Sequence, residues 1–183
     1  MNPIAARIRA LRRQQKRPLR DIADRCGFTT GLLSKIETGK TTPPIATLAK
    51  IAAALGVALG DLVDGGGPLT AVFQSAASRV ALPATLTEKG YGFHLLASGR
   101  AAKTMQPILF EARRGEIRPG PLSHEGEEFV YVLEGRMNYR VGATTYTLGP
   151  GDSLYFDPRE EHDLEPLTAV VRYLAVLSTP PAS

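Results

Sequence analysis

Hydrophobic residues recur every three or four positions through the first third of the chain, which is the period of amphipathic helices. The first helix is expected to begin near Pro3, with Asn2 as its cap. The apolar faces of the five expected helices are Ile4, Ile8 and Leu11, then Leu19, Ile22, Ala23 and Cys26, then Leu33 and Ile36, then Ile45, Leu48, Ile51 and Leu55, and last Leu59, Leu62 and Val63. The pattern therefore predicts that residues 1–64 form an all-α bundle of about five helices.

Residues 27–39 combine a short apolar stripe with a polar outer face. Thr29 is a suitable N-cap, and Gly39 is a suitable left-handed C-cap. The residues expected to face outward are Thr30, Gly31, Ser34 and Lys35. Small polar residues at a helix start, followed by a cation one turn later, suit a helix whose first turn enters the major groove of DNA. On this stretch alone, an ordinary surface helix is the alternative.

Further along the chain, short runs of β-branched and aromatic residues alternate with Gly, Pro and Asp turns, which is an all-β pattern. The expected strands are residues 70–74, 78–82, 91–97, 107–113, 127–134, 136–141, 144–148, 152–157, 161–165 and 168–178. A chain with this many short strands limits its open edges by forming a double-sheet jelly roll or a small barrel. The sequence therefore predicts two domains, one all-α and one all-β.

A Gly-rich run from Asp64 to Pro68 separates the two patterns. We expect a helical domain at 1–64, a linker at 65–69, a β domain at 70–178 and a tail at 179–183. Residues 1–64 hold 11 Lys or Arg against 5 Asp or Glu, whereas residues 65–183 hold 11 against 13. A positive helical domain suits a protein that neutralises nucleic-acid phosphates with that domain only.

The sequence contains no apolar run that approaches the length of a membrane span. The N-terminal arginines are not followed by the apolar core of a signal peptide, so we expect a cytoplasmic protein with no membrane partner. The single cysteine, Cys26, cannot form an internal disulfide and is expected to be a small buried hydrophobe.

The run from Leu19 to Lys40, LRDIADRCGFTTGLLSKIETGK, resembles the helix-turn-helix of the phage-repressor (XRE) family. The resemblance covers about residues 4–64. It implies base contacts from Thr30, Gly31, Ser34 and Lys35, and phosphate contacts from Arg20, Thr29 and Lys40. The chain departs from the family pattern at Pro18 and Pro44, which stand where a Ser or Thr helix cap is usual. Proline is well tolerated at a helix start.

His124, Glu128 and His162 carry most of the chemistry in the β domain. His124 and Glu128 are four residues apart on a segment expected to be extended, so both side chains should lie on one face. Residues 119–128, 134–135 and 151–162 resemble the two motifs of the cupin family, and the match spans about residues 105–177. The usual cupin metal site has a further histidine where this chain has Leu122.

The cupin resemblance implies that two histidines and one carboxylate hold a divalent metal, for which Fe, Zn, Ni and Mn are candidates. The alternative is that these residues line an effector pocket with no metal. Acidic residues expected at the solvated barrel mouth are Glu125, Glu127, Glu160, Glu161 and Asp163. Aromatic residues expected in core or dimer packing are Tyr131, Tyr139, Tyr155, Phe156 and Tyr173.

A helix-turn-helix joined to a cupin resembles a class of bacterial transcription regulators. This implies a non-enzymatic regulator that binds a double-stranded DNA operator as a homodimer and holds a small-molecule effector in its barrel. An iron-dependent epoxidase of phosphonate biosynthesis has the same layout and triad, so a non-haem iron enzyme is the alternative. A structural DNA-binding protein with an inert barrel is a third interpretation. The short linker is expected to tether the helical domain loosely, so that its position depends on contacts with the barrel or the dimer interface.

Overall fold

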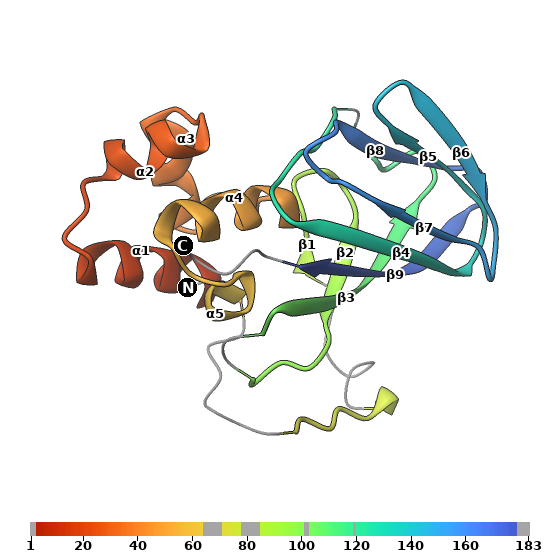
Figure 1. Cartoon of the computed structure of the whole chain (residues 1–183), viewed down its shortest axis with the longest axis horizontal. Coiled ribbons are helices and arrows are strands. Elements are labelled where there is room, and N and C mark those ends of the chain that lie inside the picture. Colours follow the sequence, from red (N-terminus) through yellow and green to blue (C-terminus); the bar gives the residue numbers. More distant parts are fainter. Residues whose placement is uncertain (1–2, 64–70, 78–84, 101–102, 119, 179–183) are drawn as a thin grey trace.

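The computed structural model describes residues 3–63, 71–77, 85–100, 103–118 and 120–178. Within these ranges the helices are α1 (Pro3–Gln14), α2 (Leu19–Cys26), α3 (Thr30–Glu37), α4 (Ile45–Leu55) and α5 (Leu59–Val63). The strands are β1 (Thr85–Leu86), β2 (Gly92–Leu95), β3 (Met105–Arg113), β4 (Glu127–Glu134), β5 (Met137–Val141), β6 (Thr144–Leu148), β7 (Ser153–Phe156), β8 (His162–Pro166) and β9 (Val170–Ser178). The helices gather on one side of the molecule and the sheets on the other (Figure 1). In the described ranges, no helix has both the length and the apolar character of a membrane span.

The ends of the helices follow from Gly and Pro at the positions that the sequence singles out. Gly27 and Gly56 end α2 and α4 in the left-handed conformation, with φ of 70° and 68°. Pro18 and Pro44 are the N-caps of these two helices, with φ of −67° and −58°, and neither provides a side-chain cap hydrogen bond. The proline ring favours these φ values. Both helices therefore begin at the expected positions although Pro18 and Pro44 replace the Ser or Thr that is usual in the family. The expected cap Asn2 lies outside the described residues.

The five helices pack around fully buried Ile8, Ile22, Leu33, Leu48 and Ile51. These residues belong to the apolar stripes that the helical period predicts. An ion pair also lies in this packing. It joins α1 to α3 through two hydrogen bonds, from Arg12 Nε to Glu37 Oε1 at 2.6 Å and from Arg12 Nη2 to Glu37 Oε2 at 2.8 Å.

The β domain consists of two antiparallel sheets. Six strands pair in the order β1-β2-β3-β9-β4-β7, and three pair in the order β6-β5-β8. Alternate residues of β3 and β9 are buried, including Ile108, Phe110, Tyr173 and Ala175. The two sheets form the expected jelly roll, but hydrogen bonding does not close it into a barrel within the described residues, where Leu122 and His162 form an isolated bridge.

The first strands of the β domain differ from the expectation. Residues 71–74 are described and contain no strand, so the strand expected at 70–74 is wrong, and the one expected at 78–82 lies outside the described residues. Phe73 is 92% exposed, which shows that this apolar run has no sheet edge to pack against. Strand β1 was not expected, and it exists because Thr85 and Leu86 pair with Phe93 and Gly92. Pairing partners decide short strands more than local composition does.

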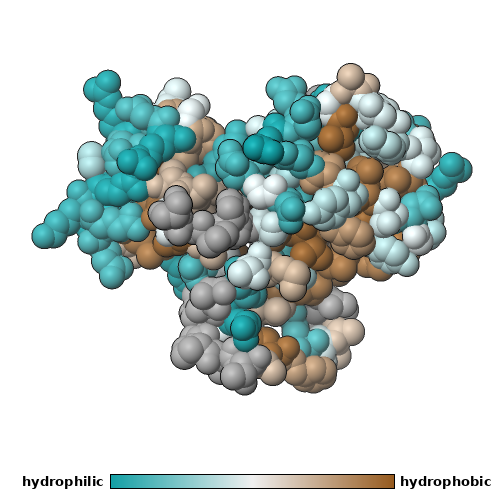
Figure 2. Space-filling model, viewed as in Figure 1, coloured by the Kyte–Doolittle hydropathy of each residue, from teal (hydrophilic) through white to brown (hydrophobic). Residues whose placement is uncertain are grey.

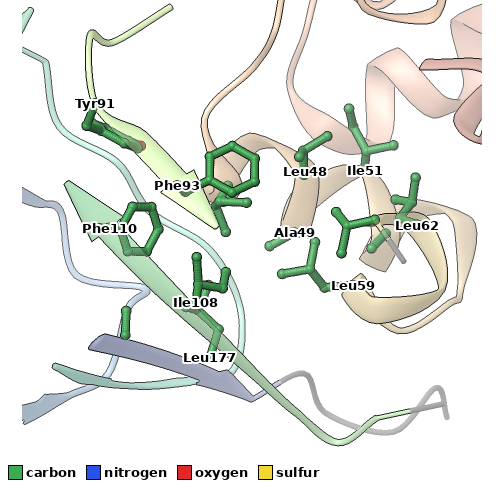
Figure 3. Packing of buried hydrophobic residues seen from close by; sticks show 14 of the residues in the cluster. Leu48, Ala49, Ile51, Leu59, Leu62, Tyr91, Phe93, Ile108, Phe110 and Leu177 are labelled. Atoms are coloured by element: carbon green, nitrogen blue, oxygen red, sulfur yellow. The ribbon is translucent and has the colours of Figure 1, made fainter. Parts of the chain in front are cut away.

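The helical domain packs directly against the six-stranded sheet. Buried residues of both domains form one hydrophobic cluster, and Figure 3 shows Phe93 and Ile108 of the strands directed toward Leu48, Ala49 and Leu59 of the helices. Two hydrogen bonds add to this contact: Thr41 Oγ1 donates to Glu88 Oε2 at 2.8 Å, and Glu88 N donates to Thr42 O at 3.0 Å. The helical domain is therefore held by packing as well as by covalent connection. The expected linker at 65–69 lies outside the described residues.

A close approach at Gly60 shows how tight this interface is. A Cβ added to Gly60 would lie 3.0 Å from Cε of Lys103 and 3.1 Å from Oε1 of Gln106, both in the β domain. Lys103 and Gln106 are themselves buried. A larger residue at this point of α5 would require the side chains of Lys103 and Gln106 to shift.

Candidate functional site

Helix α3 is held by local hydrogen bonds at both ends. The side chain of Thr29 accepts a hydrogen bond of 3.2 Å from Leu32 N, which caps the N-terminus. At the other end Gly39, with φ of 71°, and Lys40 donate backbone hydrogen bonds to Ile36 O and Lys35 O. Leu33, Ile36 and Glu37 are buried, so the position of α3 is set by its apolar face and by the Arg12–Glu37 pair.

All seven residues predicted to contact DNA are exposed. They are Arg20, Thr29, Thr30, Gly31, Ser34, Lys35 and Lys40. Arg20 lies on α2, where its guanidinium is 3.6 Å from the carboxylate of Asp24, and both side chains face solvent. The remaining six lie on α3 or directly beside it. Figure 2 shows that hydrophilic residues gather over the outer end of the helical domain.

A second candidate site is a cavity of about 520 Å³ between the two sheets, which we call the jelly-roll pocket. Its lining comes from both domains: Ile45, Ala46, Lys89, Tyr91, Phe110, Arg114, Gly115, Ile117, Arg118, Gly120, Leu122, His124, Glu128, Tyr139, His162, Asp163, Leu164, Glu165, Pro166, Tyr173 and Leu177. The volume is in the range of small-molecule sites. Ile45 and Ala46 form the first turn of α4, so a molecule in this pocket contacts the helical domain directly.

His124, Glu128 and His162 meet at the inner wall of the pocket, and all three are buried. Glu128 Oε2 lies 3.0 Å from Nε2 of His124 and 3.8 Å from Nε2 of His162. The segment between His124 and Glu128 is not a continuous strand, as the sequence had suggested, because it bends at Glu125 and Gly126 before β4 begins. The two side chains meet because His124 N donates to Pro158 O and because Glu128 occupies an inward position of β4.

The two histidine rings are oriented by backbone carbonyls. Nδ1 of His124 lies 3.0 Å from Glu125 O, and Nδ1 of His162 lies 3.0 Å from Glu160 O. A carbonyl oxygen only accepts, so each Nδ1 carries the hydrogen and, in the neutral ring, each Nε2 presents a lone pair. Each of the three residues thus offers one ligand atom, and these three atoms lie within 4.8 Å of one another. This donor set fits a divalent metal, whose histidine ligands are commonly held by such outer hydrogen bonds.

Burial shapes the protonation of this site. Burial lowers the pKa of His162 from its ordinary value, although the nearby Glu128 carboxylate raises it in part. A neutral imidazole at neutral pH suits a metal ligand. Burial also raises the pKa of Tyr139 well above its ordinary value, so the hydroxyl stays protonated and donates a hydrogen bond of 3.3 Å to Glu128 Oε1.

Several expectations for neighbouring residues are resolved by the structure. Tyr139, Phe156 and Tyr173 are buried, whereas Tyr131 and Tyr155 are exposed on the outer face of the sheet. Of the five acidic residues expected at the barrel mouth, Glu125, Glu127, Glu160 and Glu161 are exposed and Asp163 is half-buried. Asp163 instead lines the pocket and pairs with Arg140, whose Nη2 donates to Asp163 Oδ2 at 2.6 Å.

Sequence reasoning missed the contribution of Ile45, Ala46, Lys89, Arg114 and Arg118 to the pocket. In the sequence, Ile45 and Ala46 have the pattern of core residues of a helix in the helical domain. The basic residues lie outside the motif segments and have no periodic signal. Their role depends on which segments the fold brings together.

Comparison with family models assigns both parts of the chain. Residues 8–62 match the helix-turn-helix model and residues 108–176 match the cupin domain model. The HTH-type transcriptional regulator PuuR of Escherichia coli is 24% identical over 178 residues, which cover 95% of this chain and 93% of PuuR. The uncharacterized HTH-type transcriptional regulator RghRB of Bacillus subtilis is 38% identical over 72 residues, which cover 39% of this chain and 52% of RghRB.

Two kinds of solved structure share the fold. An HTH_3 family transcriptional regulator from Vibrio cholerae has a TM-score of 0.71 at 20% identity, covering 98% of this chain and 96% of that chain. Hydroxypropylphosphonic acid epoxidase from S. wedmorenis has a TM-score of 0.50 at 22% identity, covering 96% of this chain and 97% of that chain. At these identities the likeness concerns the fold alone.

Proposed function

We propose that this chain, which carries a helix-turn-helix domain followed by a cupin domain, is a transcriptional regulator that responds to a small molecule bound in the jelly-roll pocket. The observation that carries the proposal is the position of Ile45 and Ala46. Both residues belong to the helical domain and both line the pocket of the β domain. A ligand in the pocket therefore contacts the domain that presents α3.

The DNA-binding part of the proposal rests on exposure and charge. Exposed Thr30 and Gly31 at the start of α3, and Ser34 and Lys35 about one turn later, would contact base edges. Exposed Arg20, Thr29 and Lys40 flank α3 and would contact phosphates. The names of PuuR, RghRB and the Vibrio cholerae protein, all transcriptional regulators, support this function.

The regulatory part follows from linkage. A ligand changes operator affinity only if it binds the DNA-competent and incompetent arrangements unequally, with a typical coupling of about 1–3 kcal/mol. The contact of the pocket with α4 supplies such an inequality, because shifting the helical domain on the sheet removes part of the pocket wall. Operator DNA must then change the affinity of the ligand by the same factor.

The triad extends the proposal to a metal. His124, Glu128 and His162 would hold a divalent ion such as Fe, Zn, Ni or Mn, and a three-ligand site leaves coordination positions open to an effector. Tyr139 keeps the Glu128 carboxylate oriented through its hydrogen bond. The backbone carbonyls of Glu125 and Glu160 keep the two imidazoles in the tautomer that offers Nε2.

We further propose that the regulator acts as a homodimer on an inverted repeat. One recognition helix contacts too few base pairs to give sequence specificity. A two-fold symmetric dimer would bind two half-sites that lie about one turn of the DNA helix, or a multiple of it, apart. Exposed Tyr131, Leu133 and Tyr155 on the outer face of the six-stranded sheet are available for such contacts. Footprinting that shows protection of a single half-site by a monomer would contradict this arrangement.

The test combines a thermal-shift screen of metabolites and divalent metals with operator binding. A compound that stabilises the protein should also change operator affinity, and the operator should change the affinity of that compound equally. The triple variant His124→Ala, Glu128→Ala, His162→Ala should lose the response and keep unliganded DNA binding. A triple variant that still responds would place the effector elsewhere.

A second candidate function is a non-haem iron enzyme. It is favoured by the buried triad together with the fold shared with the S. wedmorenis epoxidase. In that case the purified chain would carry near-stoichiometric iron and consume oxygen with an organic substrate. A regulator would instead show ligand-dependent operator binding without oxygen consumption.

A further inference from the structure

The acidic residues that line the jelly-roll pocket already have hydrogen-bond partners. Asp163 is paired with Arg140 at 2.6 Å, and Glu165 accepts a hydrogen bond of 3.3 Å from Asn138 Nδ2. Glu128 Oε1 accepts a hydrogen bond of 3.3 Å from the hydroxyl of Tyr139, and Glu128 Oε2 lies 3.0 Å from Nε2 of His124. Among these described contacts, Asp163 is thus paired with a guanidinium, whereas Glu165 and Glu128 accept hydrogen bonds from a neutral amide and a neutral hydroxyl.

The arginines of the pocket are in a different situation. Arg114 and Arg118 lie on the segment that follows β3, and both are exposed and line the pocket. Among the residues that the structure describes, neither guanidinium has a hydrogen-bond acceptor or an ion-pair partner. The other arginine beside them, Arg113, donates instead to Glu111 at 2.7 Å and is not part of the lining.

Lys89 brings a third positive charge to the same side of the pocket. Its backbone carbonyl accepts a hydrogen bond of 2.9 Å from Arg118 N, so the two residues are neighbours. Its Nζ donates a hydrogen bond of 2.9 Å to Gly120 O. The adjacent residue Glu88 bonds to Thr41 and Thr42, so this positive side lies next to the segment that leads into α4.

The rest of the lining is largely apolar. Ile45, Phe110, Ile117, Leu122 and Leu177 contribute side chains without polar atoms. Tyr91 and Tyr173 add aromatic surface. A ligand that fills this volume must therefore bury an apolar body, because an unpaired polar group would lose its hydration here.

Resting on the proposed function that this pocket is the effector site, we propose that its ligand is a small organic anion with an apolar body, whose anionic group is bound by Arg114 and Arg118. Guanidinium groups bind carboxylates and phosphorus oxyanions through paired N–H donors, which suits such a head group. An ammonium group at the same position would be repelled by the two guanidinium groups. The pocket therefore selects anions and rejects amines of the same shape.

The test uses three compounds that share one skeleton and differ in the head group: 3-phenylpropanoate, 3-phenyl-1-propanol and 3-phenylpropylamine. Binding to the full-length wild-type protein is measured by calorimetry and by the shift of the melting temperature at constant ionic strength. We expect the acid to bind and to raise the melting temperature, and the alcohol and amine to bind at least about tenfold more weakly. Equal binding of the three, tighter binding of the amine, or no binding of the acid at millimolar concentration overturns the proposal.

The arginines are tested with the double variant Arg114→Gln, Arg118→Gln. Its matched control is Arg113→Gln, Arg159→Gln, which removes the same charge from two arginines outside the pocket lining. The acid should bind the first variant about tenfold or more weakly than the wild type, and the control should bind it as the wild type does. Unchanged binding to the first variant, or an equal loss in both, would show that Arg114 and Arg118 do not hold the anion.

A third measurement separates this proposal from the proposed function. Operator affinity is determined with and without saturating 3-phenylpropanoate. If the acid binds through the two arginines and leaves operator affinity unchanged, the ligand class stands and the regulatory role of the pocket is wrong. If another compound shifts operator affinity while the acid fails to bind, the regulatory role stands and the ligand class is wrong.

Discussion

The hydroxyl of Thr41, in the loop before α4, donates a hydrogen bond of 2.8 Å to the carboxylate of Glu88 in the β domain. This bond joins the domain that presents α3 to the edge of the pocket that carries Lys89 and Arg118. It adds a polar contact to surfaces that also meet through apolar side chains. The contact therefore reports on whether the two domains stay docked.

A double-mutant cycle of Thr41→Val and Glu88→Ala should measure this bond. We expect an interaction free energy of about 0.5–1.5 kcal/mol by chemical denaturation, because a partly exposed hydrogen bond contributes in this range. The control cycle pairs Thr41→Val with Glu116→Ala, which removes an exposed carboxylate without a bond to Thr41. Additive effects in both cycles would mean that the domains do not hold this contact in solution.

A second prediction concerns α3 as the DNA-recognition helix. Lys35→Ala should relax the sequence preference of DNA binding, because Lys35 lies on the outer face of α3. The loss of binding free energy on the best operator should be about 1–3 kcal/mol. Lys40→Ala should weaken binding to all DNA sequences alike. It should also reduce the slope of log affinity against log salt concentration by about one, as the loss of a phosphate contact does. Gel-shift titrations at several salt concentrations separate the two. Arg136→Ala in the β domain serves as the charge control, and equal losses of specific and non-specific binding in both lysine variants would show that α3 is misplaced.

The Arg12–Glu37 pair makes a prediction about stability. The two side chains are 13% and 5% exposed, and Arg12 also donates to Arg17 O at 2.9 Å. Arg12→Ala should lower the free energy of unfolding by about 3–5 kcal/mol, because it leaves the Glu37 carboxylate buried and unpaired. Arg159→Ala, which breaks the exposed pair with Asp157, should lower the free energy of unfolding far less, because solvent screens an exposed pair. Similar losses in the two variants would place Glu37 in solvent.

His162 makes the metal-free protein sensitive to acid. Its pKa is lowered in the folded chain by burial, so as the pH falls the unfolded chain takes up the proton first. The unfolded state then binds more protons, and stability falls as the pH drops through the ordinary histidine pKa of about 6.5 toward the lower folded value. In EDTA, the free energy of unfolding of the wild type should drop more between pH 7 and pH 5 than that of His162→Gln. Parallel curves for the two proteins would contradict the shift.

Cys26 offers a probe of the helical core. Burial raises the pKa of its thiol to about 11, and the thiol donates a weak hydrogen bond to Lys50 O. Since the thiolate is the reactive form, alkylation by iodoacetamide at pH 8 should be slow in the folded protein and fast in denaturant. The chain has one cysteine, so mass spectrometry reports this site alone. Rapid labelling without denaturant would show that α2 does not pack on α4 as described.

The period of apolar residues determined the helices, and Gly and Pro determined where they end. Ile22, Leu33 and Ile51 are buried because their spacing leaves one side of each helix apolar, and Gly27 and Gly56 adopt a positive φ that other residues disfavour. These are local constraints, carried by neighbours within a few residues. The sequence also predicted which residues form the triad, because His124, Glu128 and His162 lie in the segments that resemble the cupin motifs.

Only the tertiary structure decided which distant segments meet. Thr85 and Leu86 form a strand because β2 offers an edge, whereas the apolar run at Phe73 has none. Tyr139 is a partner of Glu128 because β5 faces β4 across the pocket, a relation between sheets that no spacing encodes. Ile45, Arg114 and Arg118 share one pocket although they come from two domains, because burying the apolar faces of α4 and of the six-stranded sheet against each other brings them together.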